Sequence, residues 1–274
     1  MCGETAIGKS MDFNKDFEKY LTRSYREYAG KSADAAEDLA ADVYAAWANE
    51  PNTALGGISP RAYFAALTDA QELVGMFCEA YTAKQTPCPL LLDRMAEVDG
   101  CAERLKRLTA QTGLPDALKT AAVSFLREHG ITPPTADYVR ILMDPLSNVE
   151  LCNVCVEALC DVAGEAAPLL WEAADRAEET QKAYCAEVLL CAPQDERTYR
   201  LLTSLFESGR DIPLYAWYLG KYGDERAAAL LYKQLETCTY IEYVEIRNAI
   251  ERMGGYVEDM RDFSLDGDYK KMNG

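Results

Sequence analysis

The feature that most constrains the fold is a pattern that recurs about every 30 residues in the second half of the chain. Paired leucines occur at 169/170, 201/202 and 230/231, first 32 and then 29 residues apart. The tripeptide Asp-Glu-Arg begins at residue 195 and again at residue 224, and a leucine pair starts six residues after each. Two helices in a period of this length are typical of an α-solenoid, in which helical pairs stack on one another.

Helical periodicity is not confined to the repeats. Apolar residues recur at helical spacing through almost all of the 274 residues, Gly and Pro interrupt them, and no segment alternates like a strand, so an all-α fold is predicted. In the first half, Ser10 is expected to cap a helix that runs to about residue 28, and Ser32 a second helix that stops before Pro51. Further helices are predicted over 60–67, 69–83, 89–98, 100–111, 115–129, 135–143, 147–162, 165–177, 179–191, 194–208, 213–221, 224–236 and 239–253.

Three regions are expected from this pattern. Residues 10–112 form an N-terminal helical segment, residues 113–260 form the helical repeats, and residues 261–274 form a flexible tail. The first 112 residues carry a net charge of −5, and residues 113–274, with 16 basic and 28 acidic residues, carry −12. The repeats therefore hold most of the negative charge.

One stretch of the repeats resembles a known family. Residues 222–255, YGDERAAALLYKQLETCTYIEYVEIRNAIERMGG, are similar to short HEAT-type repeats of phycobilisome-lyase-like proteins, in which a Gly-Asp turn precedes a helix with Ala and paired Leu. Residues 163–177 and 192–208 resemble the pattern more weakly, because Pro193 replaces the glycine in the second stretch and the usual Val-Arg dipeptide is mostly absent. The resemblance implies a short HEAT-like solenoid that binds through an extended surface. It does not imply lyase activity, because no residue of such a site can be matched.

A second resemblance is shorter. Residues 47–60, WANEPNTALGGISP, are similar to a motif in the toxin-binding domain of certain bacterial antitoxins, where a helix ending in Trp is followed by Pro-Asn, Ala-Leu-Gly-Gly and Ser/Thr-Pro. The residues also have a purely local explanation. Pro51 stops one helix, Gly56 and Gly57 supply positive φ, Ser59 caps the next helix and Pro60 fits its first position.

The net charge of −17 excludes several classes of partner. A polyanion repels phosphate backbones and anionic membrane surfaces, so neither nucleic acid nor a membrane is an expected partner. With no signal-peptide core near the N-terminus and no apolar run of about 18 residues, a cytoplasmic location is expected. A basic protein or peptide is the partner class that the charge favours.

Motifs that suggest chemistry have simpler explanations. Residues 3–10, GETAIGKS, match the phosphate-loop expression but lack the preceding strand that the motif needs. The single histidine, His129, is placed at a helix end, where it can interact with C-terminal carbonyls. Cys152, Cys155 and Cys160 lie inside a predicted helix and recur one repeat later as Cys185 and Cys191, which favours core thiols over a metal site. No cofactor and no metal are expected.

These observations favour a non-catalytic protein–protein interaction or scaffold module. Its partner-binding residues are predicted two positions beyond each leucine pair, at Glu172, Ser204 and Lys233, where they would form an exposed ridge. The alternative is an enzyme with a carboxylate-lined cleft between the N-terminal helices and the repeats, which the abundance of Asp and Glu permits.

Overall fold

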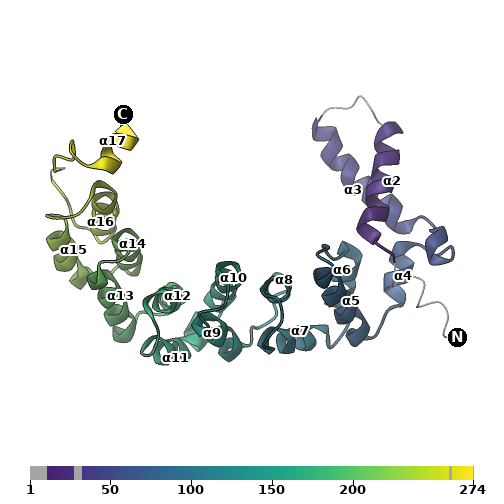
Figure 1. Cartoon of the computed structure of the whole chain (residues 1–274), viewed down its shortest axis with the longest axis horizontal. Helices are drawn as coiled ribbons and strands as arrows, with labels where there is room; N and C mark the ends of the chain where they lie inside the picture. Colours follow the sequence, from purple (N-terminus) through teal and green to yellow (C-terminus); the bar gives the residue numbers. More distant parts are fainter. Residues whose placement is uncertain (1–10, 28–32, 259–260, 274) are drawn as a thin grey trace. The chain divides into compact units, whose positions relative to one another are not determined.

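A computed structural model describes residues 11–27, 33–258 and 261–273 (Figure 1). It is 71% helical and has no strand in these ranges, so the all-α prediction is confirmed for this part of the chain. The chain divides into two compact units, Met1–Ile131 and Thr132–Gly274. This division falls later than the expected boundary between 112 and 113, because the helix after that boundary, α8 (Asp116–Glu128), packs on α5 (Ala70–Thr82) and α7 (Cys101–Ala110).

The first unit contains seven described α-helices and one short 3-10 helix. They are α2 (Phe13–Glu27), α3 (Ala33–Asn49), η1 (Thr53–Leu55), α4 (Pro60–Ala66), α5 (Ala70–Thr82), α6 (Pro89–Glu97), α7 (Cys101–Ala110) and α8 (Asp116–Glu128). Its core is built from large apolar side chains on all of these helices, among them Trp47, Phe64, Leu73, Phe77 and Leu105. The predicted caps Ser10 and Ser32 lie outside the described residues.

The turn between α3 and α4 forms as its residues predict. Gly56 and Gly57 have positive φ values of 70° and 92°, which side chains disfavour. The Ser59 side chain accepts a hydrogen bond from the Ala62 amide at 3.2 Å, and Pro60 is the first residue of α4. The local explanation of residues 47–60 is therefore correct, and it does not depend on whether the motif binds a toxin.

The second unit contains the repeats. Its helices are α9 (Thr135–Met143), α10 (Val149–Cys160), α11 (Ala163–Ala174), α12 (Glu179–Leu189), α13 (Glu196–Ser208), α14 (Ile212–Tyr222), η2 (Glu225–Ala227), α15 (Ala228–Gln234), α16 (Tyr240–Arg252) and α17 (Gly267–Asn273). Figure 1 shows α9, α11, α13 and α15 along one side of this unit and α10, α12, α14 and α16 along the other. Consecutive helices from α9 to α14 pack on one another, and α15 packs on α16.

A glycine permits a close contact between two helices of the second unit. Helices α14 and α16 pack together, and a Cβ atom added at Gly220 would lie 2.7 Å from the Cα of Ala249. Real Cβ atoms do not come so close to backbone, so the two helices need glycine and alanine at this crossing.

Residues 261–273 differ from the expected flexible tail. Phe263 is buried, with its ring centroid 5.0 Å from that of Tyr243, and α17 packs on α16. Asp266 accepts hydrogen bonds from the amides of Asp268 and Tyr269, at 2.9 and 3.1 Å, at the start of α17. The aspartates of this segment therefore act as local caps.

Candidate functional site

The leucine pairs divide each repeat into a buried and an outer side. Leu170, Leu202 and Leu231 are completely buried, whereas Leu169, the residue before Leu170, is 39% exposed. On a helix, the position two residues after a core residue points away from that core. The burial of the second leucine therefore determines which residues of α11, α13 and α15 meet solvent.

The three predicted ridge residues are all exposed. Glu172 lies on α11, where it forms an ion pair with Arg176 at 3.6 Å. Ser204 lies on α13 and donates its hydroxyl proton to the Leu201 carbonyl at 2.8 Å, and Lys233 lies on α15. The three occupy equivalent positions on separate helices, and their role in binding stays a prediction.

An open groove lies beside Glu172, between α9, α11 and the start of α12. Its volume is about 470 Å³, within the range of small-ligand sites. The walls are mostly apolar, and the rim is polar. The groove is lined by Ala136, Val139, Met143, Pro145, Leu169, Glu172, Ala173, Arg176, Ala177, Glu178 and Gln181. Sequence reasoning missed this groove. The signal that could have found it is Leu169, an apolar residue that lies beside the core position Leu170 and is partly exposed.

The polar groups of the groove are mainly acceptors. Glu172 and Glu178 bring two carboxylates, and Arg176 brings one guanidinium that Glu172 already pairs. The side-chain carbonyl oxygen of Gln181 is buried and has no hydrogen-bond partner among the described residues. Because this oxygen is buried, the acceptors that a ligand can reach in the groove are the two carboxylates. The groove thus favours a ligand that combines an apolar group with hydrogen-bond donors.

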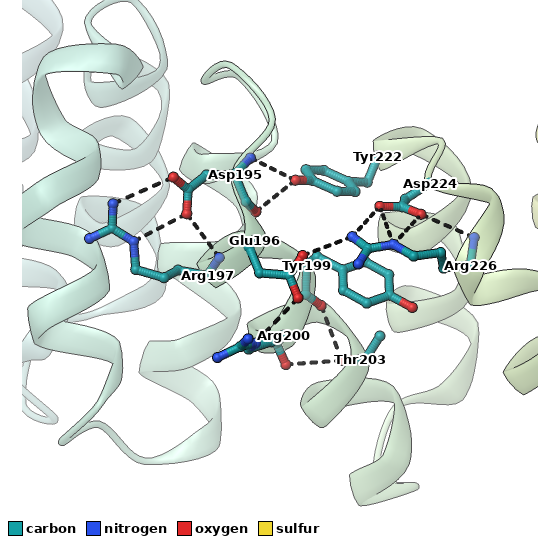
Figure 2. Close-up of polar contacts among 9 residues, drawn as sticks. All are labelled: Asp195, Glu196, Arg197, Tyr199, Arg200, Thr203, Tyr222, Asp224 and Arg226. Carbon is teal, nitrogen blue, oxygen red and sulfur yellow. Dashed lines mark hydrogen bonds and ion pairs between the residues drawn. The ribbon is translucent and has the colours of Figure 1, made fainter.

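The repeated Asp-Glu-Arg tripeptide has a structural role (Figure 2). Asp195 accepts a hydrogen bond from the Arg197 amide at 2.8 Å, and Asp224 accepts one from the Arg226 amide at 3.0 Å. Hydrogen bonds from the arginine side chains hold the pKa of both aspartates below its usual range. Each aspartate therefore caps the start of its repeat as a charged group.

The arginines of the same tripeptides connect neighbouring repeats. The guanidinium carbon of Arg197 lies 3.5 Å from the ring centroid of Trp171, and that of Arg226 lies 4.1 Å from the ring centroid of Tyr199. Arg226 also donates to Glu196 at 2.9 Å (Figure 2). Stacking of arginine on an aromatic face is favourable at this distance, so the tripeptide ties each repeat to the preceding one.

One carboxylate of α2 makes two hydrogen bonds to the motif of residues 47–60. The indole nitrogen of Trp47 and the side-chain amide nitrogen of Asn52 both donate to the same Oδ2 atom of Asp16, each at 2.9 Å. Trp47 is 2% exposed. These contacts give both residues a packing role, and toxin binding stays an expectation of the resemblance.

The cysteines have two kinds of surroundings. Cys152, Cys155 and Cys185 are buried, as expected of core thiols. Cys160 and Cys191 differ, since Cys191 is exposed and its sulfur lies 3.0 Å from that of Cys160. In the described part of the chain, no group of three or more His, Cys, Asp or Glu side chains could hold a metal ion.

The single histidine and the aromatic residues of α14 lie in structural surroundings. His129 follows the last residue of α8, and its Nδ1 lies 2.8 Å from the Phe125 carbonyl oxygen, the helix-end placement that the sequence predicted. Tyr215, Tyr218 and Tyr222 are buried, and Trp217 is partly buried. Residues 3–10, which match the phosphate-loop expression, lie outside the described residues.

Comparison with known proteins gives no match to a family model, to a curated protein or to a solved structure. Among the described helices, none is both long enough and apolar enough to cross a membrane. Any statement about function therefore rests on the groove and on the surface around it.

Proposed function

We propose that residues 132–274 form a short HEAT-like α-solenoid that acts as a non-catalytic interaction module. Its groove between α9, α11 and α12 would receive a peptide segment of a basic partner protein. The observation that carries this proposal is the groove itself, because an open apolar groove of this volume beside exposed carboxylates suits an apolar side chain flanked by Lys or Arg.

The solenoid assignment is supported by the way in which the repeats are connected. Helices α9 to α16 follow one another in two rows, and the Asp-Glu-Arg tripeptide forms the same cap and the same type of stacking contact in two successive repeats. Contacts that are repeated between neighbours are what a stack of equivalent units requires.

The basic character of the partner is supported by charge at two scales. Residues 132–274 carry 14 basic and 26 acidic residues, so the field around this unit attracts cations. At the groove, Glu172 and Glu178 offer carboxylates that can accept hydrogen bonds from a bound cation. The ridge formed by Ser204 and Lys233 would meet a partner that extends beyond one repeat. The enzyme alternative stays a hypothesis.

The proposal is tested by selecting short random peptides displayed on phage against the full-length protein. We expect the bound peptides to combine a large apolar residue with Lys or Arg. The dissociation constant of a selected peptide, measured by fluorescence anisotropy, should rise with ionic strength because exposed charges are screened over about 8–10 Å.

Two variants locate the binding site. Glu172→Lys should weaken peptide binding about threefold to tenfold, the effect of about 1 kcal/mol from an exposed charge, and Ala173→Phe should block the groove. The matched controls are Glu207→Lys on α13 and Ala229→Phe on α15, which change exposed residues outside the groove. Selection of acidic peptides, salt-independent binding, or equal loss in the controls would contradict the proposal.

A further inference from the structure

Two thiols from successive repeats lie next to each other at the C-terminal ends of α10 and α12. Cys160 is the last residue of α10, and Cys191 lies just beyond the end of α12. Their sulfur atoms are 3.0 Å apart, about 1 Å more than the ~2.05 Å of a disulfide bond. Helices α10 and α12 pack directly on each other, so this closeness is built into the packing of the repeats.

Among the cysteines of the second unit, Cys160 and Cys191 are the two that a reagent can reach. Cys191 is exposed and Cys160 is partly exposed, whereas Cys152, Cys155 and Cys185 are each at most 2% exposed. An accessible thiol with a second thiol in contact with it is the arrangement of a redox-active pair, in which one sulfur is attacked and the other resolves.

We propose that Cys160 and Cys191 form a dithiol site that a low-molecular-weight disulfide, such as oxidised glutathione, converts into an intramolecular disulfide. The proposal is independent of what the groove binds.

The reaction proceeds in two exchange steps. The exposed Cys191 loses its proton to solvent and attacks one sulfur of the small disulfide, which releases one small thiol and leaves a mixed disulfide on Cys191. Cys160 then loses its proton and attacks the Cys191 sulfur, which releases the second small thiol. The two protein sulfurs are oxidised by two electrons in total, and the small disulfide is reduced to two thiols.

The surroundings assign the order of the two residues. Burial, followed by the hydrogen bond with Cys191, raises the pKa of the Cys160 thiol to about 12. A thiol that ionises so reluctantly is a poor first nucleophile. Cys160 therefore takes part only once Cys191 is already activated as a mixed disulfide, when the attack is intramolecular.

The bond would change the protein in a defined way. It would close a loop over residues 160–191, which contains α11 and α12, and join the ends of α10 and α12. A crosslink of this span restricts the unfolded chain, so the oxidised protein should melt at a temperature on the order of 5 °C higher than the reduced protein.

The test uses the full-length reduced protein, incubated with oxidised glutathione and then alkylated. A Glu-specific protease places each thiol in its own peptide, 158–165 for Cys160 and 188–196 for Cys191, and separates them from Cys155 and Cys185. We expect an intact mass about 2 Da lower before alkylation, a crosslink between these two peptides, and the higher melting temperature, all reversed by dithiothreitol.

The variants separate the roles of the two thiols. Cys160→Ser should stop at a mixed disulfide, with one glutathionyl group on Cys191, and Cys160→Ala should do the same. Cys191→Ser should leave Cys160 unmodified, and the control Cys78→Ser, which changes a partly exposed thiol of the first unit, should still form the crosslink. The proposal is wrong if both thiols remain alkylatable in excess oxidised glutathione, if each carries its own glutathionyl group, or if other cysteines form the crosslink.

Discussion

At the scale of single residues, the two members of a leucine pair illustrate how burial decides the effect of a substitution. Leu170 is completely buried, and Leu169, its neighbour on α11, is 39% exposed. We predict that Leu170→Ala lowers the free energy of unfolding by about 2–5 kcal/mol, whereas Leu169→Ala lowers it by less than about 1 kcal/mol. Urea denaturation measures both. Equal losses would mean that the helical register of α11 is wrong.

In the first unit, the carboxylate of Asp16 accepts two side-chain hydrogen bonds from partly buried groups. Its Oδ2 atom accepts hydrogen bonds from both Trp47 and Asn52, so Asp16→Ala leaves two partly buried donors without an acceptor. We predict a loss of about 1–3 kcal/mol of stability, together with a change in Trp fluorescence. The control Asp42→Ala, at an exposed position of α3, should change stability by less than about 0.5 kcal/mol.

At the scale of helices, the crossing of α14 and α16 depends on the absence of a side chain. Gly220→Ala would place a methyl group against the Ala249 backbone, which cannot move aside without separating the two helices. We predict that this change lowers the urea midpoint by the equivalent of about 1–3 kcal/mol, although alanine is the better helix former by about 1 kcal/mol.

Gly164→Ala is the matched control in the same unit. Gly164 lies in α11, and an added Cβ atom would meet only the Pro193 side chain, at an ordinary 3.9 Å. This substitution should leave the urea midpoint unchanged or raise it, because alanine restricts the unfolded chain. A stabilising Gly220→Ala would show that α14 and α16 do not pack as closely as described.

At the scale of the whole molecule, the pairing of carboxylates with arginines predicts the response to acid. Hydrogen bonds from arginine hold the pKa of Asp195, Glu196 and Asp224 below its usual range. A lowered folded-state pKa contributes stability above the unfolded pKa of about 4, and this contribution is lost as pH falls through the folded-state pKa. Burial raises the pKa of Glu187, which acts in the opposite direction.

We therefore expect the urea midpoint to fall between about pH 4.5 and pH 2.5. Arg226→Gln removes the arginine partner of Asp224 and one of the two arginine partners of Glu196, so it should make this decline shallower. Arg252→Gln, at an exposed residue of α16, makes the same change in net charge and should leave the decline as it is. Identical pH profiles for the two variants would show that general charge repulsion, not these pairs, sets the response.

The sequence alone was enough to predict the features that arise from interactions within a few residues. Helical periodicity, Gly and Pro breaks and Asp or Ser caps act within a few residues, so the predicted helices match the observed ones closely between residues 60 and 253. The leucine spacing likewise placed Glu172, Ser204 and Lys233 on the exposed side of their helices, because burial alternates with the helical period.

Contacts between residues far apart in the sequence could not be predicted and are seen only in the tertiary structure. The groove combines Met143, Leu169 and Gln181 from three helices, the Cys160–Cys191 pair joins residues 31 positions apart, and Phe263 anchors a segment expected to be free. Each depends on the distance and the angle at which helices pack. The packing distance and angle depend on the shapes of all the side chains at a contact, so they cannot be predicted from the periodicity of one segment.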